Sequence, residues 1–446
     1  MPTNQVQRDV RETPLRESSP LSKNDTRPSG CDEFAKLDRR RLLFGSAVRA
    51  AACAGAAAAV LPRVTLAGGG SGSRDVLVLL FLRGGMDGLT LCSPHADGDY
   101  YAQRGALAVP PPGSPGGSID LDGFFGLAPS AAALHPAYTS GDLAFIHTSG
   151  STDPTRSHFE AMKFIEAGIP NQGDAFYSSG WLARHLNGVS PLGTSEMRAM
   201  AIDSTTPLSL IGGDKVLAID DPSDFDFAGY DHTKQARRAV LENMFAHAPS
   251  PLNSAAVSTF DTIDLFQSID FENYTPSGGA VYPDSEFGNR LKHTAALIKA
   301  DIDLEAIEID RGGWDDHDNM GPLNGALADR LTELSQALAA FRTDLGAEMN
   351  RVTVVAQSEF GRRVDANGSG GTDHGRGGLM MLMGGNVNGG QVYRNWVGLS
   401  TDDLDDLALP VQIDYRDVLS EVLFRRMGNP ASVFPNYTPT YPGYVS

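Results

Sequence analysis

The stretch RGGWDDHDNM (311–320) gathers carboxylates, an amide and an imidazole around one tryptophan. Asp315 and His317 are two residues apart, and the glycines before them let the backbone wrap. Carboxylate oxygen and imidazole nitrogen form a ligand mixture that zinc, manganese and iron accept in proteins. A calcium loop of the helix–loop–helix kind is disfavoured, because the spacing differs and no closing glutamate follows. The alternative is a polar turn whose carboxylates bind backbone amides while Trp314 packs inward.

Similar polar segments follow other apolar runs. RGGMDG contains Asp87, TSGSTD contains Thr152 and Asp153, and SEFGR contains Glu359. Each has a structural explanation when it is taken alone, such as an Asx-turn at Asp87 or a helix cap at Asp153 ahead of Pro154. Their common position after an apolar run is what favours a shared role.

The runs before these segments have the character of buried strands. They are apolar without alternation, as in a parallel sheet covered on both faces, and they span 75–83, 142–148, 215–220, 304–310 and 351–357. The carboxyl ends of parallel strands lie at one edge of the sheet, where ligands bind. The sequence therefore predicts a metal or oxyanion site at that edge.

Helical patterns separate these runs. In 322–345, leucine or phenylalanine recurs every three or four residues, which predicts one apolar stripe. Three further helices are predicted at 232–247, 285–301 and 415–427. The alternation predicts a single α/β domain over 75–446, with a largely parallel central sheet and helices on both faces. Insertions are expected at 108–130 and 186–231.

The N-terminal region has the features of an export signal. Arg39-Arg40 and Leu42-Leu43 resemble the twin-arginine motif, and Thr65-Leu66-Ala67 supplies small residues for a signal peptidase. The apolar run 50–62 is too short to cross about 30 Å of hydrocarbon. Cys53 raises a lipoprotein alternative, but the usual leucine is missing before it. We predict a signal region over 1–67, a linker over 68–74 and a periplasmic or secreted chain without a stable membrane span.

The charge of the exported part excludes some partners. The full chain has 446 residues, of which 41% are hydrophobic, enough to bury a core. Residues 1–67 hold 11 of the 36 basic and 7 of the 55 acidic residues, so the remainder has a net charge of −23. Such a surface repels nucleic acid and anionic lipid. Cys92 is the one cysteine of that part, so no intramolecular disulfide can form.

The motifs LRGGMDGL, RSHFEA, GGWDDHDN, SEFGRR and GTDHGRGG, in this order after the leader, resemble a bacterial family known as domain of unknown function 1501, over roughly 75–430. Its members are similar in fold to alkaline phosphatases and sulfatases. The resemblance implies metal ligands at Asp87, Asp315, His317, Glu359 and His374, or at Asp373 with His374 in another register. Phe360 stands where that superfamily has a histidine, so the two-zinc set is incomplete. A single-metal, altered-metal or inactive site is expected.

A helix is expected to begin in STDPTRSHFEAM, and free amides at a helix start stabilise an oxyanion. Two hydroxyls compete as nucleophile. Thr152 in TDPTR resembles the sulfatase pattern Cys-x-Pro-Ser-Arg, and Ser157 in RSHF is favoured, with His158 as proton carrier or ligand. The arginines that would neutralise the anion are Arg156, Arg362 and Arg376.

Two functions follow from these residues. The first is an exported hydrolase of small phosphate or sulfate esters that uses a divalent metal, namely zinc, manganese or calcium. The alternative is a non-catalytic periplasmic protein that retains the fold and serves as a binding or assembly partner of another protein. Phe360 favours the second function, whereas the hydroxyl-rich helix start favours the first.

Overall fold

The computed structural model describes residues 75–171, 178–191, 197–227, 229–431 and 433–446. The predicted signal region 1–67 and linker 68–74 lie outside the described residues. A central sheet has the strand order β11-β5-β10-β9-β1-β8-β6-β7, with β12 beside β5. Its strands are β1 (Val76–Leu82), β5 (Leu143–Gly150), β6 (Ala199–Ile202), β7 (Val216–Ile219), β8 (Ala306–Arg311), β9 (Val352–Gln357), β10 (Gly378–Met383), β11 (Gln391–Tyr393) and β12 (Ile413–Asp414).

Every strand of this sheet except β10 runs in the same direction. β1 pairs in parallel with β8 and β9, β6 pairs in parallel with β7 and β8, and β11 and β12 are parallel to β5. β10 is antiparallel to both β5 and β9. The predicted α/β class with a largely parallel sheet is confirmed, and the five apolar runs form β1, β5, β7, β8 and β9.

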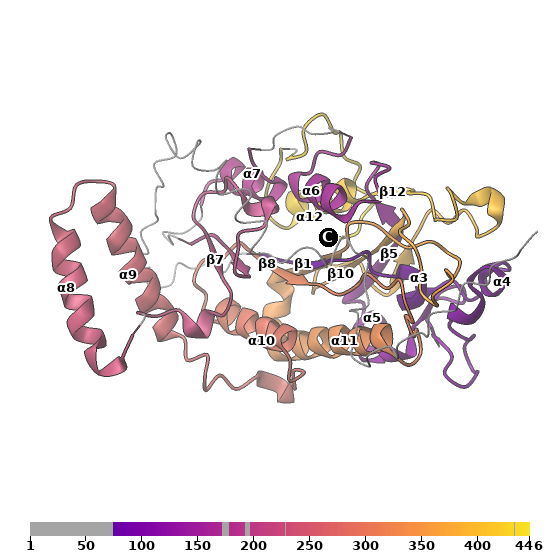
Figure 1. Ribbon diagram of the computed structural model, residues 1–446, viewed down its shortest axis with the longest axis horizontal. Helices are drawn as coiled ribbons and strands as arrows, with labels where there is room; N and C mark the ends of the chain where they lie inside the picture. Colours follow the sequence, from indigo (N-terminus) through magenta and orange to yellow (C-terminus); the bar gives the residue numbers. More distant parts are fainter. Residues whose placement is uncertain (1–74, 172–177, 192–196, 228, 432) are drawn as a thin grey trace, which may run out of the picture.

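Helices lie on both faces of the sheet (Figure 1). α6, α7 and α12 cover one face, and α10 and α11 cover the other. The helices are α3 (Gly88–Leu91), α4 (Tyr100–Arg104), α5 (His135–Thr139), α6 (His158–Ala167), α7 (Trp181–Gly188), α8 (Lys234–Ala246), α9 (Leu252–Ser268), α10 (Glu286–Lys299), α11 (Ala326–Leu345) and α12 (Tyr415–Arg425). The four predicted helices correspond to α8, α10, α11 and α12.

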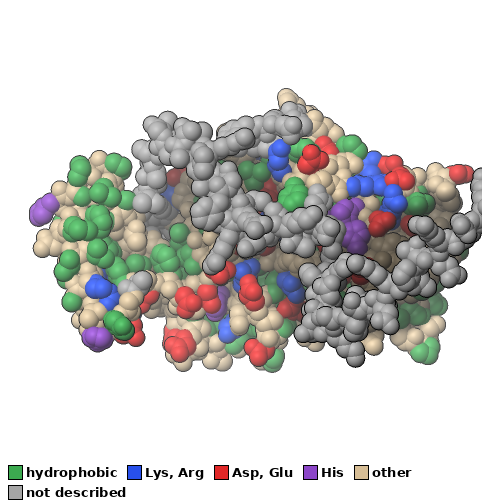
Figure 2. All heavy atoms as spheres, viewed as in Figure 1, with side chains coloured by type: hydrophobic (Ala, Val, Ile, Leu, Met, Phe, Trp, Pro, Cys, Tyr) green, Lys and Arg blue, Asp and Glu red, His purple; other side chains and the backbone are tan. Residues whose placement is uncertain are grey.

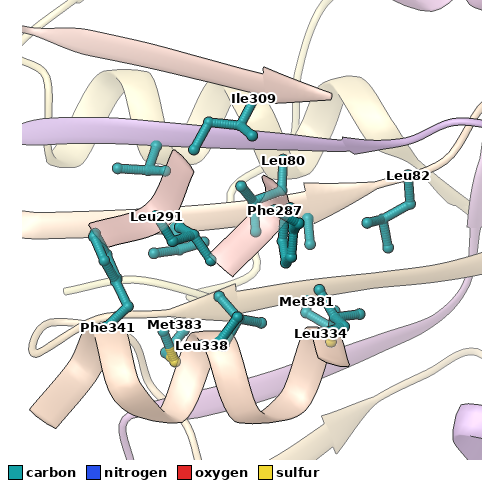
Figure 3. Close-up of a cluster of buried hydrophobic side chains, with 14 of the residues drawn as sticks. Leu80, Leu82, Phe287, Leu291, Ile309, Leu334, Leu338, Phe341, Met381 and Met383 are labelled. Carbon is teal, nitrogen blue, oxygen red and sulfur yellow. The ribbon is translucent and has the colours of Figure 1, made fainter. Parts of the chain in front are cut away.

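Alternate side chains of β1 enter two separate cores. Val78 and Leu80 pack with α10 and α11, whereas Leu77 and Leu79 pack with α7 and α12 on the other face. Figure 3 shows Leu80 among side chains of α10, α11 and β10. All seven side chains of β1 are buried, and each fully buried leucine or valine contributes about 1.5–3 kcal/mol. Because β1 is buried on both faces and between two strands, its position in the sheet is fixed, and so is the sheet edge at which it ends.

Some elements did not follow from the sequence pattern. Within 186–231, which was expected to be an insertion, β6 joins the main sheet beside β8 and pairs with the predicted strand β7. Within 108–130, two short strands join a small sheet of their own, formed by β2 (Cys92–Ser93), β4 (Gly126–Leu127) and β3 (Ile119–Asp120). α8 and α9 form a helical hairpin at one end of the molecule, with hydrophobic side chains on its surface (Figures 1 and 2). Among the described residues, no helix combines the length and the apolar character needed to cross a membrane.

Candidate metal centre

The loops that follow β1, β8 and β9 meet at one edge of the sheet, as the sequence predicted. The backbone N–H of Trp314 donates to the carbonyl of Arg83 over 3.2 Å, which joins the loops after β8 and β1. The backbone N–H of Gly84 donates to Glu359 Oε1 over 2.8 Å, which joins the loops after β1 and β9. Gly84 has a φ of +122°, and a Cβ there would lie 2.6 Å from the Asp315 nitrogen. The close approach of these loops therefore requires glycine.

The stretch RGGWDDHDNM is both an anchored turn and a source of converging groups. Trp314 is fully buried, and its Nε1 donates to the Arg311 carbonyl over 2.9 Å. Asp316 is paired with Arg330, and its carbonyl accepts from the backbone N–H of Thr372. Asp315 lies between these two anchored residues and His317 directly follows them. Both side chains turn toward a common point.

Three imidazoles surround one carboxylate oxygen. Asp315 Oδ1 lies 3.0 Å from His317 Nε2, 3.2 Å from His374 Nε2 and 3.4 Å from His158 Nε2. The ligand atoms of His158, Asp315 and His374 all lie within 4.8 Å of one another. His317 Nε2 lies 2.9 Å from His374 Nε2. These four residues, here called the Asp315 cluster, come from the start of α6, the loop after β8 and the loop before β10.

The other nitrogen of each imidazole is held by an acceptor behind it. His158 Nδ1 lies 2.6 Å from Glu359 Oε1, and His317 Nδ1 lies 3.3 Å from Asp373 Oδ1. His374 Nδ1 lies 2.7 Å from the carbonyl oxygen of Arg156. An acceptor at Nδ1 holds a ring N–H on that side, so Nε2 is the nitrogen that would present a lone pair to a cation, as in metal-binding histidines.

This arrangement fits a divalent cation. His317 and His374 bring their Nε2 atoms within 2.9 Å of each other, and both nitrogens also lie beside Asp315 Oδ1. A cation between them would accept both lone pairs, together with Asp315 and His158. Three nitrogens and one carboxylate oxygen match the donors of zinc sites and also suit manganese or iron. Calcium prefers oxygen ligands, so the donor set does not favour it.

The pKa values of the groups in and beside the Asp315 cluster depend strongly on one another. Burial raises the pKa of Asp315, but hydrogen bonds from His158, His317 and His374 and the nearby Arg362 lower it further than burial raises it. Burial lowers the pKa of His158, but hydrogen bonds to Asp315 and Glu359 outweigh burial and raise it to about 9. Burial raises the pKa of Glu359, yet the hydrogen bond from His158 produces a net lowering. Both carboxylates are therefore kept ionised.

Glu359 and Asp373, two of the predicted metal ligands, lie behind histidines instead of facing the common point. Glu359 is 1% exposed and binds His158, the Gly84 amide and the hydroxyl of Ser358. Asp373 binds His317 and the side-chain amide of Asn367. The structure thus gives these two carboxylates the task of orienting imidazoles, which in metal sites raises ligand basicity.

Asp87, a further predicted ligand, is placed outside the Asp315 cluster. Its Oδ1 accepts from the Thr90 amide over 3.0 Å and caps α3, which is the Asx-type alternative. Its Oδ2 is paired with Arg104, whose side chain is fully buried. Phe360 packs against two imidazoles of the Asp315 cluster, with ring centroids 4.8 Å from His158 and 4.9 Å from His374. An apolar wall thus replaces the ligand expected at that position.

Arg362 does not offer its guanidinium to a substrate. It is 2% exposed and donates to Asp315 Oδ1 over 2.7 Å. Its remaining donors bind backbone carbonyls of three loops, at Gly84, Gly85, Trp314 and Thr372. Arg362 thus holds the loops together around Asp315. The other two predicted anion-binding arginines, Arg156 and Arg376, are paired with Asp406 and Asp405.

The two predicted nucleophiles lie at different places. Ser157 is the N-cap residue of α6, directly before His158, and its hydroxyl makes no capping hydrogen bond. Thr152 is exposed, and its Oγ1 accepts from the side chain of Asn171 over 3.2 Å. Asp153 binds the amides of Thr155 and Asn171, so the helix begins at His158 and not beside Pro154.

A cavity of about 720 Å³ adjoins the Asp315 cluster and shares His158 with it. One wall is a single face of α6, formed by Phe159, Met162, Lys163 and Glu166. The facing wall comes from α10, and the floor from the ends of β1 and β8. The cavity therefore lies outside the carboxyl ends of parallel strands, where open α/β sheets bind ligands.

A family model described as "Protein of unknown function (DUF1501)" matches residues 144–428, well over half of the chain. The chain belongs to this family. The match begins at β5 and includes the whole Asp315 cluster. A search of curated proteins finds no match.

Solved structures with a similar arrangement belong to the alkaline phosphatase and sulfatase group. A protein in the alkaline phosphatase superfamily from Vibrio parahaemolyticus has 12% identity and a TM-score of 0.34, covering 81% of this chain and 72% of that one. The PsFucS1 sulfatase from Pseudoalteromonas sp. has 12% identity and a TM-score of 0.34, covering 79% of this chain and 67% of that one. The C-terminal periplasmic domain of EcEptC from Escherichia coli, in complex with Zn, has 11% identity and a TM-score of 0.36, covering 85% and 92%.

The sequence pattern did not place His158 among the predicted metal ligands, but left it as a proton carrier or ligand. The segment RSHFEA carries no ligand spacing of its own, because its partners lie 157 or more positions later in the chain. Its position before an amphipathic helix was the available signal. The role of Arg362 was also missed, since backbone carbonyls as partners leave no trace in the sequence.

Proposed function

We propose that this chain is a metal-dependent hydrolase of phosphate or sulfate esters, with one divalent cation held by His158, Asp315, His317 and His374. The observation that carries the proposal is the convergence of three Nε2 atoms on Asp315 Oδ1 while each Nδ1 is held from behind. Zinc fits this donor set best, and manganese is the second choice. Bound there, the cation would act as a Lewis acid toward an ester oxygen.

Ser157 is the proposed nucleophile, and Thr152 is the second choice. Ser157 comes directly before the ligand His158 and at the N-terminus of α6, which has ten residues. The free amides of the first turn of such a helix favour negative charge on a bound ester. Glu359 would orient His158, and Arg362 would hold Asp315 in place. Residues 1–67 are proposed to direct the chain to the periplasm by twin-arginine export.

The second candidate is a metal-containing protein without catalytic activity. Phe360 occupies the place of a further ligand and packs against His158 and His374. Arg156, Arg362 and Arg376 are all paired with carboxylates of the chain, so none of these three is held ready for an anionic ester. These observations favour binding or assembly as the role, with the cation as a structural element.

Two measurements separate the candidates. Metal analysis of protein purified without chelator is expected to give one zinc or manganese per chain, whichever candidate is correct. Hydrolysis of 4-nitrophenyl phosphate and 4-nitrophenyl sulfate then tests catalysis. Ser157→Ala is expected to abolish turnover and to leave metal content unchanged. Full turnover in both Ser157→Ala and Thr152→Ala would refute the catalytic role of the helix start.

A further inference from the structure

We propose that the cavity beside His158 binds the uncharged organic part of the ester, a group with several hydroxyls and one apolar face. This inference rests on the proposed hydrolase function and adds a substrate class to it. The cavity has about 720 Å³, within the range of about 300–1,000 Å³ typical of ligand sites. Because His158 belongs to both the cavity and the Asp315 cluster, a ligand held here would place its esterified end at the metal centre.

The charged side chains that line the cavity balance one another, because its three arginines and Lys163 are matched by four carboxylates, Glu166, Glu286, Asp310 and Glu333. Its three arginines are all paired: Arg83 with Glu166 and Asp310, both at 2.5 Å, Arg290 with Glu286 at 2.6 Å, and Arg311 with Glu333 at 2.7 Å. An anion would meet a carboxylate beside every guanidinium, and a cation would meet a guanidinium beside every carboxylate. Neither charge has a complementary patch here.

A hydroxyl group suits the same lining. Each pair places guanidinium N–H donors next to carboxylate acceptors, and a hydroxyl both donates and accepts. A ligand with several hydroxyls can therefore bridge the pairs without breaking them. An unpaired buried polar group would cost about 1–3 kcal/mol, so a ligand that lacks the hydroxyls is disfavoured where these groups lose water.

Apolar side chains complete the lining. Phe159 and Met162 lie on one face of α6, Pro207 and Leu208 lie on the segment before η3 and in η3 itself (Leu208–Leu210), and Phe287 lies on α10. These residues offer an apolar surface to the face of a ring, while the ion pairs reach its edge. A polyhydroxylated ring, with apolar faces and a polar edge, matches both parts.

The test uses ligand-observed saturation-transfer NMR, which does not depend on turnover. Methyl β-D-glucopyranoside is the hydroxylated probe, cyclohexyl methyl ether is its apolar counterpart, and methyl phosphate is the anionic probe. Saturation is expected to transfer to the glucopyranoside, much less to the ether, and not to be displaced by methyl phosphate. Equal transfer to the ether, or displacement by methyl phosphate, would overturn the proposal.

Variants locate the site. Met162→Trp on α6 and Leu208→Trp in η3 fill the cavity from two different elements and are expected to abolish transfer to the glucopyranoside. Val240→Trp is the matched control, since Val240 is 65% exposed on α8. Thermal unfolding checks that the variants fold. Because the two substitutions lie on different elements, one of them can still test the site if the other does not fold. Unchanged transfer in both folded variants would contradict binding in this cavity.

A charge variant and a metal-site variant complete the design. Glu333→Gln releases Arg311 from its pair, so methyl phosphate should begin to bind, which shows that pairing is what excludes the anion. His317→Ala should lose metal and retain binding of the glucopyranoside. In the wild-type protein, glucopyranoside binding without any ester hydrolysis would refute the hydrolase function alone, and ester hydrolysis without glucopyranoside binding would refute the cavity assignment alone.

Discussion

Two carboxylates, Asp310 and Asp315, lie five residues apart on the same segment, and their charges are compensated in different ways. Asp310, at the end of β8, is joined by Glu166 and Glu308 around the guanidinium of Arg83. Asp315, in the following loop, is surrounded by three imidazoles and Arg362. The first group carries its own fixed cation between the carboxylates. The second turns three Nε2 atoms toward a common point, and this difference makes it the candidate metal centre.

Removal of the fixed cation of the first group should have the largest effect. Arg83→Met leaves Glu166 and Asp310 without their partner, and breaking a buried ion pair costs about 3–5 kcal/mol. Urea unfolding of the two proteins measures the loss. Arg311→Met is the control, because its pair with Glu333 is more exposed and should cost at most about 1 kcal/mol. Equal losses of stability in the two variants would show that the ion pairs of Arg83 contribute no more than the exposed pair of Arg311.

Removal of a ligand from the second group should abolish metal binding. His317→Ala and Asp315→Ala are each expected to weaken the affinity for zinc by more than about 100-fold, beyond the loss from an outer hydrogen-bond partner. Competition with a chelating dye measures the affinity. Asp310→Asn, five residues earlier, should retain wild-type affinity. Metal loss in Asp310→Asn would show that Asp310 also takes part in metal binding. Retention of metal in His317→Ala would contradict the role of His317 as a ligand.

Glu359→Gln tests the partner behind the imidazole. The amide keeps an acceptor for His158 and for the Gly84 N–H but removes the charge, so zinc affinity should fall by about 10–100-fold. Asp373→Asn should have a smaller effect, because its contact with His317 is longer, at 3.3 Å, and more exposed. The same dye competition checks both. A larger loss in Asp373→Asn would reverse the assigned order.

Glu308→Gln should have the smallest effect near pH 5, and its effect should grow as the pH rises. Burial raises the pKa of Glu308 well above its ordinary value, and the charges of Glu166 and Asp310 raise it further. Below the unfolded pKa of about 4.3, both states hold the proton and the stabilising contribution is complete. As pH rises above that value only the folded state keeps it, so stability falls by up to about 1.4 kcal/mol per pH unit.

Glutamine at position 308 cannot lose a proton and therefore avoids this decline. The variant should match the wild type at pH 5 within about 1 kcal/mol and exceed it increasingly toward pH 8. Urea unfolding at several pH values gives the difference. A difference that stays constant with pH would show that Glu308 is ionised in the folded protein.

The sequence by itself determined five strands of the central sheet and the edge at which they end. Apolar runs without alternation identified β1, β5, β7, β8 and β9, because burial on both faces leaves no polar positions. Strands of one direction bring their carboxyl ends together, so Asp315, His317 and Glu359 could be expected near one another before any coordinates were known. β10 escaped this reasoning, since a glycine-rich flank conceals its start.

Only the tertiary structure decided the role of each group. Asp87 and Asp315 follow parallel strands in similar glycine-rich loops, yet Asp87 meets the buried Arg104 and Asp315 meets three imidazoles. Glu359 has the right chemistry for a ligand, but its position behind His158 makes it a partner of that ligand. Which nitrogen of a histidine faces inward depends on the acceptor behind the other one. Such acceptors are brought from distant parts of the chain, or from the backbone, where residue type carries no signal.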